Sequence, residues 1–142
     1  MAALTLPIAL QEQIAREAFA ALPNECCGLI EGARDSDTFK ATALYPTLNL
    51  ATESDRFEID PAEQFNLMRT LRGTGRKIIG CYHSHPNGKA EPSARDAESA
   101  FDEHFVWLVA GVTIQGSCSL SAHIREAGEW RKLALNRMET HS

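Results

Sequence analysis

The sequence predicts a single α/β domain over residues 1–142, in which a curved mixed β-sheet is flanked by helices. Three observations support this class. The length of 142 residues suits one domain. The composition, 44% hydrophobic and 23% charged, favours a packed core over disorder. Helix-like segments with a period near 3.6 residues alternate with short apolar runs that are typical of strands.

The first half of the chain contains one predicted helix and three predicted strands. Residues 7 to about 21 carry apolar side chains at four-residue steps and form an amphipathic helix. Residues 26–32 form a short buried strand, and residues 38–49 form a second strand that we expect to break near Pro46. Residues 56–60, Arg-Phe-Glu-Ile-Asp, alternate as a strand does.

A second helix is predicted at about residues 61–72. Asp60 precedes Pro61, and this pair is typical of an N-cap followed by a proline in the first turn. The side chains expected to face inward are Phe65, Met68, and Leu71 or Leu67.

The second half is dominated by strands. Residues 77–85 are the most strand-like apolar run, a third helix follows at about 94–103, and the β-branched and aromatic residues of 105–114 indicate a buried strand. The segments SLSAHIRE and EWRKLAL flank Ala-Gly at 127–128 and predict a final hairpin.

Charge and cysteine usage limit the class of protein. The net charge is −5 with both signs mixed along the chain, so we expect neither nucleic acid nor a membrane as partner. No run approaches the length of a membrane span, and the N-terminus lacks the basic leader of a secretory signal. Four cysteines without C-x-x-C spacing indicate reduced thiols in a cytoplasmic protein: Cys26, Cys27, Cys81 and Cys118.

The stretch HSHPNGKAEPSARD, residues 83–96, has the chemistry of a metal site. Residues two apart on a strand share a face, so His83 and His85 project together from the end of the 77–85 strand. Pro86 and Gly88 allow the chain to turn back, which brings Asp96 within reach. Two nitrogens, one carboxylate oxygen and an open position are what a catalytic zinc site requires.

Hydrolysis by such a site also needs a proton-transfer group and a donor to the developing oxyanion. Glu25, which immediately precedes a buried strand, is the candidate for the first, although sequence distance alone does not place it near His83. The hydroxyl of Ser93 is the candidate for the second.

Each of these features also has a purely structural interpretation. Ser93 and Asp96 fit an N-cap and capping box, which is compatible with metal binding because a first turn holds a ligand rigidly. The histidine pair alone is more typical of surface or packing histidines than of a metal site, and Glu25 alone is typical of a solvated loop carboxylate. A Cys26 or Cys27 nucleophile is a weaker alternative, because thiols among apolar residues are usually buried and inert.

The remaining histidines match no partner spacing and are expected at the surface or its boundary: His104, His123 and His141. Tyr82 and Trp107 are expected in the core or an interface.

Three blocks of sequence, in order, resemble the JAMM (MPN-plus, JAB domain) metalloprotease family. The first is H-x-H followed by ten residues and Asp, with a Ser three before the Asp, at His83, His85, Ser93 and Asp96. The second is PNECCGLI at 23–30, which is similar to the prokaryotic P-x-E-x-C-G form. The third is the Asn of NLATESDRFEIDP, residues 49–61, followed after seven residues by Phe-x-Ile-Asp-Pro.

The resemblance implies a cytidine-deaminase-like fold and a zinc-dependent peptidase or isopeptidase. It implies one zinc ion per chain bound by His83, His85 and Asp96, with Glu25 as general acid/base and Ser93 assisting the tetrahedral intermediate. The substrate implied is a small ubiquitin-like sulfur-carrier protein, cleaved after its C-terminal Gly-Gly. Three alternatives remain: a RadC-type protein, a phage-tail-type peptidase, and a non-catalytic MPN scaffold that has lost the metal ligands.

Overall fold

The computed structural model describes residues 2–99 and 104–138. In chain order its elements are β1 (Ala3–Pro7), α1 (Ile8–Ala21), β2 (Cys27–Asp35), β3 (Thr38–Thr47), α2 (Pro61–Leu71), β4 (Lys77–His85), α3 (Ala94–Ser99), β5 (Val106–Val112), β6 (Cys118–Glu126) and β7 (Glu129–Met138). The strands form one mixed sheet in the order β1-β3-β2-β4-β5-β6-β7, which closes on itself because β1 pairs with both β3 and β7. The predicted α/β class and curved mixed sheet are confirmed.

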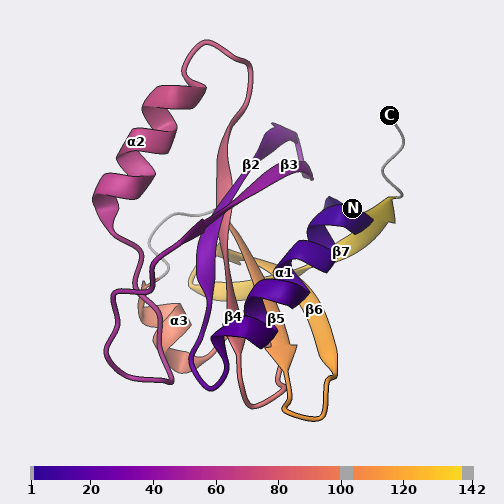
Figure 1. The fold of residues 1–142 in the computed structure, drawn as a ribbon. Helices are drawn as coiled ribbons and strands as arrows, with labels where there is room; N and C mark the ends of the chain where they lie inside the picture. The colour runs from indigo at the N-terminus through magenta and orange to yellow at the C-terminus, as the bar shows by residue number, and fades with distance from the viewer. Residues whose placement is uncertain (1, 100–103, 139–142) are drawn as a thin grey trace.

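The N-terminal strand β1 is absent from the sequence prediction. Leu4 and Leu6 are fully buried, and β1 runs parallel to β3 on one side and to β7 on the other. The predicted first helix is confirmed as α1, which starts directly after Pro7, and Figure 1 shows it lying across the sheet. A five-residue strand that leads straight into a helix carries too little periodicity to be recognised alone.

Strands β2 and β3 form an antiparallel hairpin that confirms two predicted strands. The expected break near Pro46 is wrong, because β3 continues through Pro46, which lies opposite Gly28 of β2. Strand β1 pairs with β3 only at Thr38–Lys40, so beyond that point β3 is paired on one side. Proline is tolerated in a strand where its missing N–H would face an unpaired side.

The predicted strand at residues 56–60 is wrong. This segment forms no strand, and its backbone is instead bound to the preceding loop, with Leu50 N–H donating to Glu58 O at 2.9 Å. The alternation arises because Phe57 and Ile59 pack against a core cluster. A ladder with β2 is excluded because β3 and β4 already occupy both of its sides.

Helix α2 begins as predicted, with the Asp60 carboxylate accepting a hydrogen bond from Ala62 N–H. Leu67 and Leu71 are buried, as expected. The inward positions expected for Phe65 and Met68 are wrong, since these side chains are 55% and 51% exposed. The helix contacts the sheet along a single i, i+4 line, which is narrower than the apolar face that its sequence presents.

The strands of the second half match the prediction closely. Strand β4 has the predicted bounds, and β5 lies parallel to it and is buried along its whole length. The hairpin of β6 and β7 turns at Ala127 and Gly128, both with positive φ. Helix α3 confirms the predicted third helix over Ala94–Ser99, and the expected continuation through 100–103 lies outside the described residues.

The three histidines without partner spacing differ in burial. His104 is partly exposed and pairs with Glu126 at 3.4 Å, as expected of a boundary residue. The surface position expected for His123 is wrong, because it is 6% exposed and lies 2.7 Å from the Ser121 hydroxyl. His141 lies outside the described residues.

Two faces of the sheet carry two core clusters, and β4 contributes to both. Tyr82 packs into the cluster that contains α1, whereas Cys81 and Trp107 pack into the cluster beneath α2. The core positions expected for Tyr82 and Trp107 are confirmed. From Cys81 onward the odd-numbered residues of β4 therefore face the α2 side, and this is the side on which His83 and His85 lie. No helix in the described part of the chain is both long and apolar enough to cross a membrane.

One buried carboxylate outside this region stabilises the β2–β3 hairpin. Glu31 is 1% exposed and accepts hydrogen bonds from the Thr42 hydroxyl, from the Tyr45 hydroxyl at 2.7 Å and from Arg76 at 3.0 Å. Burial raises the pKa of Glu31, but these hydrogen bonds and the Arg76 charge outweigh burial and hold its pKa below the ordinary value. Ionised Glu31 therefore stabilises the fold.

We predict that Glu31→Gln lowers the free energy of unfolding by about 1–3 kcal/mol at neutral pH, the cost of weakening hydrogen bonds to a buried charge. Because the pKa is lower in the folded state, this contribution is present above the unfolded carboxyl pKa and is lost as pH falls through the folded pKa. Urea titrations at several pH values, with chelator throughout, measure it. A difference between the two proteins that does not shrink on acidification would contradict the assignment.

Candidate metal centre

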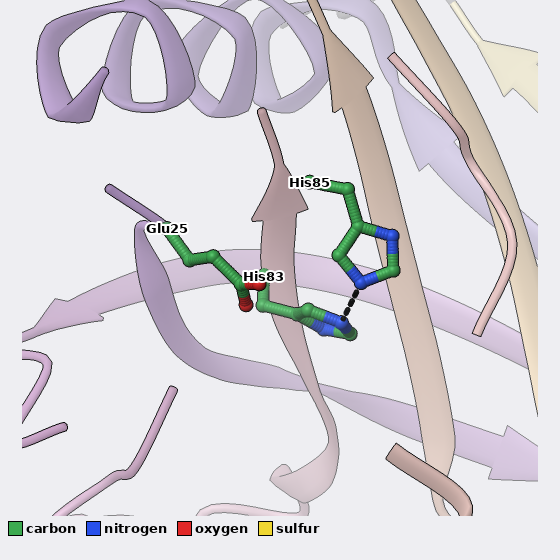
Figure 2. A group of neighbouring side chains, drawn as sticks. All are labelled: Glu25, His83 and His85. Atoms are coloured by element: carbon green, nitrogen blue, oxygen red, sulfur yellow. Dashed lines mark hydrogen bonds between the residues drawn. The ribbon is translucent and has the colours of Figure 1, made fainter. Parts of the chain in front are cut away.

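The C-terminal end of β4 carries both histidines on one face, as the strand period predicts. The two Nε2 atoms lie 3.1 Å apart, and His83 and His85 are 0% and 6% exposed. Figure 2 shows the His85 ring directed toward that of His83. Strand geometry thus brings two imidazole nitrogens to one buried point.

Asp96 reaches the same point from the first turn of α3. Its Oδ2 atom lies 3.0 Å from His83 Nε2 and 3.3 Å from His85 Nε2. The same carboxylate accepts a hydrogen bond from Ser93 N–H at 2.8 Å, while Asp96 N–H donates to Ser93 Oγ at 3.1 Å. The capping box is therefore present, and it holds the Asp96 carboxylate against both imidazoles.

Glu25 joins the group through the pairing of β2 with β4. Cys27 lies opposite His83 in this antiparallel pair, so continuing the register toward Glu25 leads toward His85. One side-chain oxygen of Glu25 and one ring nitrogen of each histidine lie within 4.8 Å of one another. The Glu25 side chain is 5% exposed and extends toward the two rings (Figure 2). It is not the solvated loop carboxylate of the structural alternative.

Contacts around the histidines fix the orientation of their rings. His85 Nδ1 lies 2.9 Å from the Lys89 carbonyl oxygen, which can only accept, so Nδ1 carries a proton and Nε2 is the ring atom directed at the centre. The Phe57 ring stacks on His83 with ring centroids 4.3 Å apart, and Trp107 contacts His83 edge-on. His83 Nδ1 is buried without a hydrogen-bond partner among the described residues, so ring packing orients His83.

The pKa values of the two carboxyl groups are shifted in opposite directions. Burial raises the pKa of Asp96, but the hydrogen bonds with His83 and His85 outweigh burial and hold its pKa well below the ordinary value. Burial also raises the pKa of Glu25, to about 7, and the nearby Asp96 charge adds to this, while His85 opposes it. Asp96 is thus a permanent anion, whereas Glu25 exchanges a proton near neutral pH.

The donor set fits a divalent metal of the zinc type. Two imidazole nitrogens and a carboxylate oxygen converge at 3.0–3.3 Å, a close approach that a shared cation would stabilise. A second buried carboxylate, Glu25, has its Oε1 atom without a hydrogen-bond partner in the described part of the chain. Imidazole with carboxylate is a donor set that zinc accepts, and a ligating histidine held by a carbonyl is the usual outer contact of such sites.

The group opens onto a cleft of about 560 Å³. Its lining includes Glu25, His85 and Ser93 together with Asp55 and Lys89. Ser93 Oγ accepts from Asp96 N–H, which leaves the hydroxyl proton available to a molecule in the cleft. All five residues singled out in the sequence therefore lie in or beside one site.

The cysteines are unsuited to act as nucleophiles. All four are free. Burial raises the pKa of Cys26 to about 11 and raises that of Cys27, so neither thiol ionises at neutral pH.

Sequence reasoning missed four residues that support the site. Ser84 Oγ accepts a hydrogen bond from Cys26 N–H at 2.8 Å and so ties the segment after Glu25 to β4. Phe57 was assigned to a strand, and Asn49 was matched to a family motif without a role. The Lys89 carbonyl acts through the backbone, so no side-chain pattern marks it. A usable signal existed only for Asn49, since asparagine often binds backbone two residues ahead, as it does to Ala51 N–H here.

Comparison with known proteins agrees with this geometry. The family model described as prokaryotic homologs of the JAB domain matches residues 7–130. The desampylase of Haloferax volcanii is 34% identical over 114 residues, which cover 80% of this chain and 78% of that protein. The CysO-cysteine peptidase of Mycobacterium tuberculosis is 29% identical over 86 residues, 59% of this chain and 58% of that protein.

The fold comparison is equally close. A solved structure of a protein from Desulfitobacterium hafniense superposes with a TM-score of 0.86 and 31% sequence identity, covering 96% of this chain and 94% of that one. The motif at 83–96, the upstream Glu25 block, the fold and the family match agree, and the chain belongs to the JAMM (JAB domain) family, among the prokaryotic homologues of that domain.

Proposed function

We propose that this protein is a zinc metallopeptidase that hydrolyses the bond after the C-terminal Gly-Gly of a small ubiquitin-like sulfur-carrier protein. The observation that carries the proposal is the convergence of Glu25, His83, His85 and Asp96 in one buried group that opens onto a cleft. The free cysteines favour a reducing compartment, so we place the activity in the cytoplasm.

Three residues would hold the metal: His83, His85 and Asp96. Bound there, a zinc ion would supply a Lewis acid that polarises the scissile carbonyl and lowers the pKa of water to about 7. His85 is already in the tautomer that ligation requires, because its Nδ1–H donates to the Lys89 carbonyl.

Glu25 would move the proton. Its Oε1 atom is buried and has no partner among the described residues, so it is free to accept a proton from the attacking water. Its pKa of about 7, set mainly by burial, lets the same carboxyl deliver that proton to the departing amine. Ser93, whose hydroxyl proton has no acceptor among the described residues, would donate to the oxyanion.

The names of two relatives support the proposed substrate class. The Mycobacterium tuberculosis relative is named a CysO-cysteine peptidase and the Haloferax volcanii relative a desampylase. Glu25 and His85 line the cleft, so a bound tail must bring its cleaved bond to a nearly buried group, which favours small residues next to that bond. Glycines at the end of a carrier tail meet this requirement.

Intact-mass spectrometry tests the substrate assignment. A ubiquitin-like carrier that ends in Gly-Gly plus a cysteine or short extension is incubated with the protein. We expect the mass to fall by the residues after Gly-Gly, while a carrier with Gly-Gly replaced by Ala-Ala stays intact. Unchanged mass with several Gly-Gly carriers would exclude this substrate class.

We predict that Glu25→Gln reduces kcat by about 100- to 10,000-fold, the usual contribution of general acid–base catalysis. The amide keeps the size of the side chain but cannot accept the proton. Zinc content, measured by elemental analysis, should stay at that of the wild type because Glu25 is outside the proposed ligand set. Normal turnover by the variant would remove Glu25 from the mechanism.

We predict about one zinc ion per chain after gentle purification, as one three-residue site requires. A chelator should abolish activity and lower the melting temperature, because an ion that binds the native state stabilises it. Added zinc should restore both, and Asp96→Ala should bind zinc much more weakly. A chain that binds no zinc would favour the non-catalytic scaffold.

We predict that Ser93→Ala lowers kcat by about 100- to 1000-fold, the effect of removing one oxyanion donor. Ser93→Thr is the matched control, because threonine keeps both the hydroxyl and the cap on α3. Steady-state kinetics compare the two. A wild-type kcat in both the alanine and the threonine variant would remove the Ser93 hydroxyl from the mechanism.

A further inference from the structure

The side chain of Asn49 makes four hydrogen bonds beside the site. Its Nδ2 group donates to the Glu25 carbonyl at 3.0 Å and to the Arg56 carbonyl at 3.1 Å. Its Oδ1 atom accepts from Ala51 N–H and from Glu58 N–H, each at 2.9 Å. One amide thus uses both donors and both acceptor positions on backbone groups.

These bonds join Glu25 to the loop at residues 56–58, and no strand pairing connects these two segments. Glu25 precedes β2 and lies outside its strand pairs, which begin at Cys27. The N–H group of the adjacent Cys26 donates a hydrogen bond to Ser84 Oγ, and the Glu25 carbonyl itself accepts one from the Asn49 amide. A backbone anchored on both sides restricts where the Glu25 carboxylate can lie.

The same amide positions the loop that covers His83. Arg56 O and Glu58 N–H, both bound to Asn49, flank Phe57 in sequence. The Phe57 ring stacks on His83 at 4.3 Å, with an angle of 19° between the rings. Asn49 therefore connects the backbone of the proposed base to the aromatic ring that packs on a proposed metal ligand.

We propose that Asn49 is a positioning residue that fixes Glu25 relative to His83, an inference that rests on the proposed peptidase function. Asn49 touches no reacting atom and acts through the Glu25 backbone and through Phe57. A displacement of a catalytic group by about 1 Å can cost roughly 100-fold in rate. Losing the Asn49 donors should therefore lower kcat while leaving substrate binding and the metal ligands in place.

Asn49→Asp is the sharpest variant. It keeps the shape and the Oδ1 acceptor, so the bonds from Ala51 and Glu58 remain, but it replaces the Nδ2 donor by an oxygen that repels the two carbonyls. Asn49→Ser is a second variant: its hydroxyl can still accept from Ala51 N–H but is too short to bridge to Glu25. The matched control is Asn66→Asp, the same change at an exposed position on α2.

The expected result is a fall in kcat of about 10- to 100-fold for Asn49→Asp relative to Asn66→Asp, the range typical of outer positioning groups. KM and zinc content should match those of the control. Unchanged kcat in both Asn49 variants would overturn the proposal. A loss of kcat that only follows loss of zinc or of folded protein would also overturn it, since it would reveal a purely structural role.

An NMR measurement without substrate tests the positioning role of Asn49 independently of the proposed peptidase function. If the wild type cleaves no carrier, the proposed substrate class fails, and NMR still tests the positioning. The Glu25 carbonyl carbon and the Phe57 ring resonances should shift in Asn49→Asp and not in Asn66→Asp. Resonances that coincide in the two variants would show that Asn49 does not hold Glu25 or the Phe57 loop.

Discussion

The pairing register of β2 with β4 is the constraint on which the site depends. Cys27 lies opposite His83, and one step further Ser84 N–H donates to Cys26 O while Ser84 Oγ accepts from Cys26 N–H. This pair of hydrogen bonds brings Glu25 close to His83 and His85, which lie about sixty positions further along the sequence. A slip of one residue would turn every β4 side chain to the opposite face. Gly28 permits this register, since a Cβ there would come within 2.4 Å of the Tyr82 side chain.

Burial turns this arrangement into distinct chemical roles. The histidines and both carboxylates are almost fully buried, so each charge is governed mainly by its neighbours. Asp96 faces both imidazoles and stays ionised, which suits a ligand. Glu25 is further from compensating charge, and burial raises its pKa to about 7, which suits a group that takes up and returns a proton.

Most of what could be predicted from the sequence rested on the periodicity and spacing of residues close together in the chain. The two-residue period placed His83 and His85 on one face, and the spacing of Ser93 and Asp96 described a cap that also presents a ligand. Glu25 could be assigned only through a family resemblance, because its position depends on a non-local strand pairing. The same limit explains the missed closure of the sheet by β1. At 56–60 the alternation was real, but the segment is hydrogen-bonded to the preceding loop rather than to a strand, and Phe57 packs on His83. The exposed Phe65 and Met68 show that an apolar helix face need not be fully covered.

X-ray absorption at the zinc edge tests the central claim most directly, because it reports the ligand atoms without assuming any substrate. The account predicts a low-coordinate shell of nitrogen and oxygen at about 2.0–2.1 Å, with imidazole scattering from two histidines. Asp96→Ala should remove the ordered shell, whereas Glu25→Gln should leave it unchanged. A sulfur shell at about 2.3 Å would place the metal on the cysteines and contradict the account.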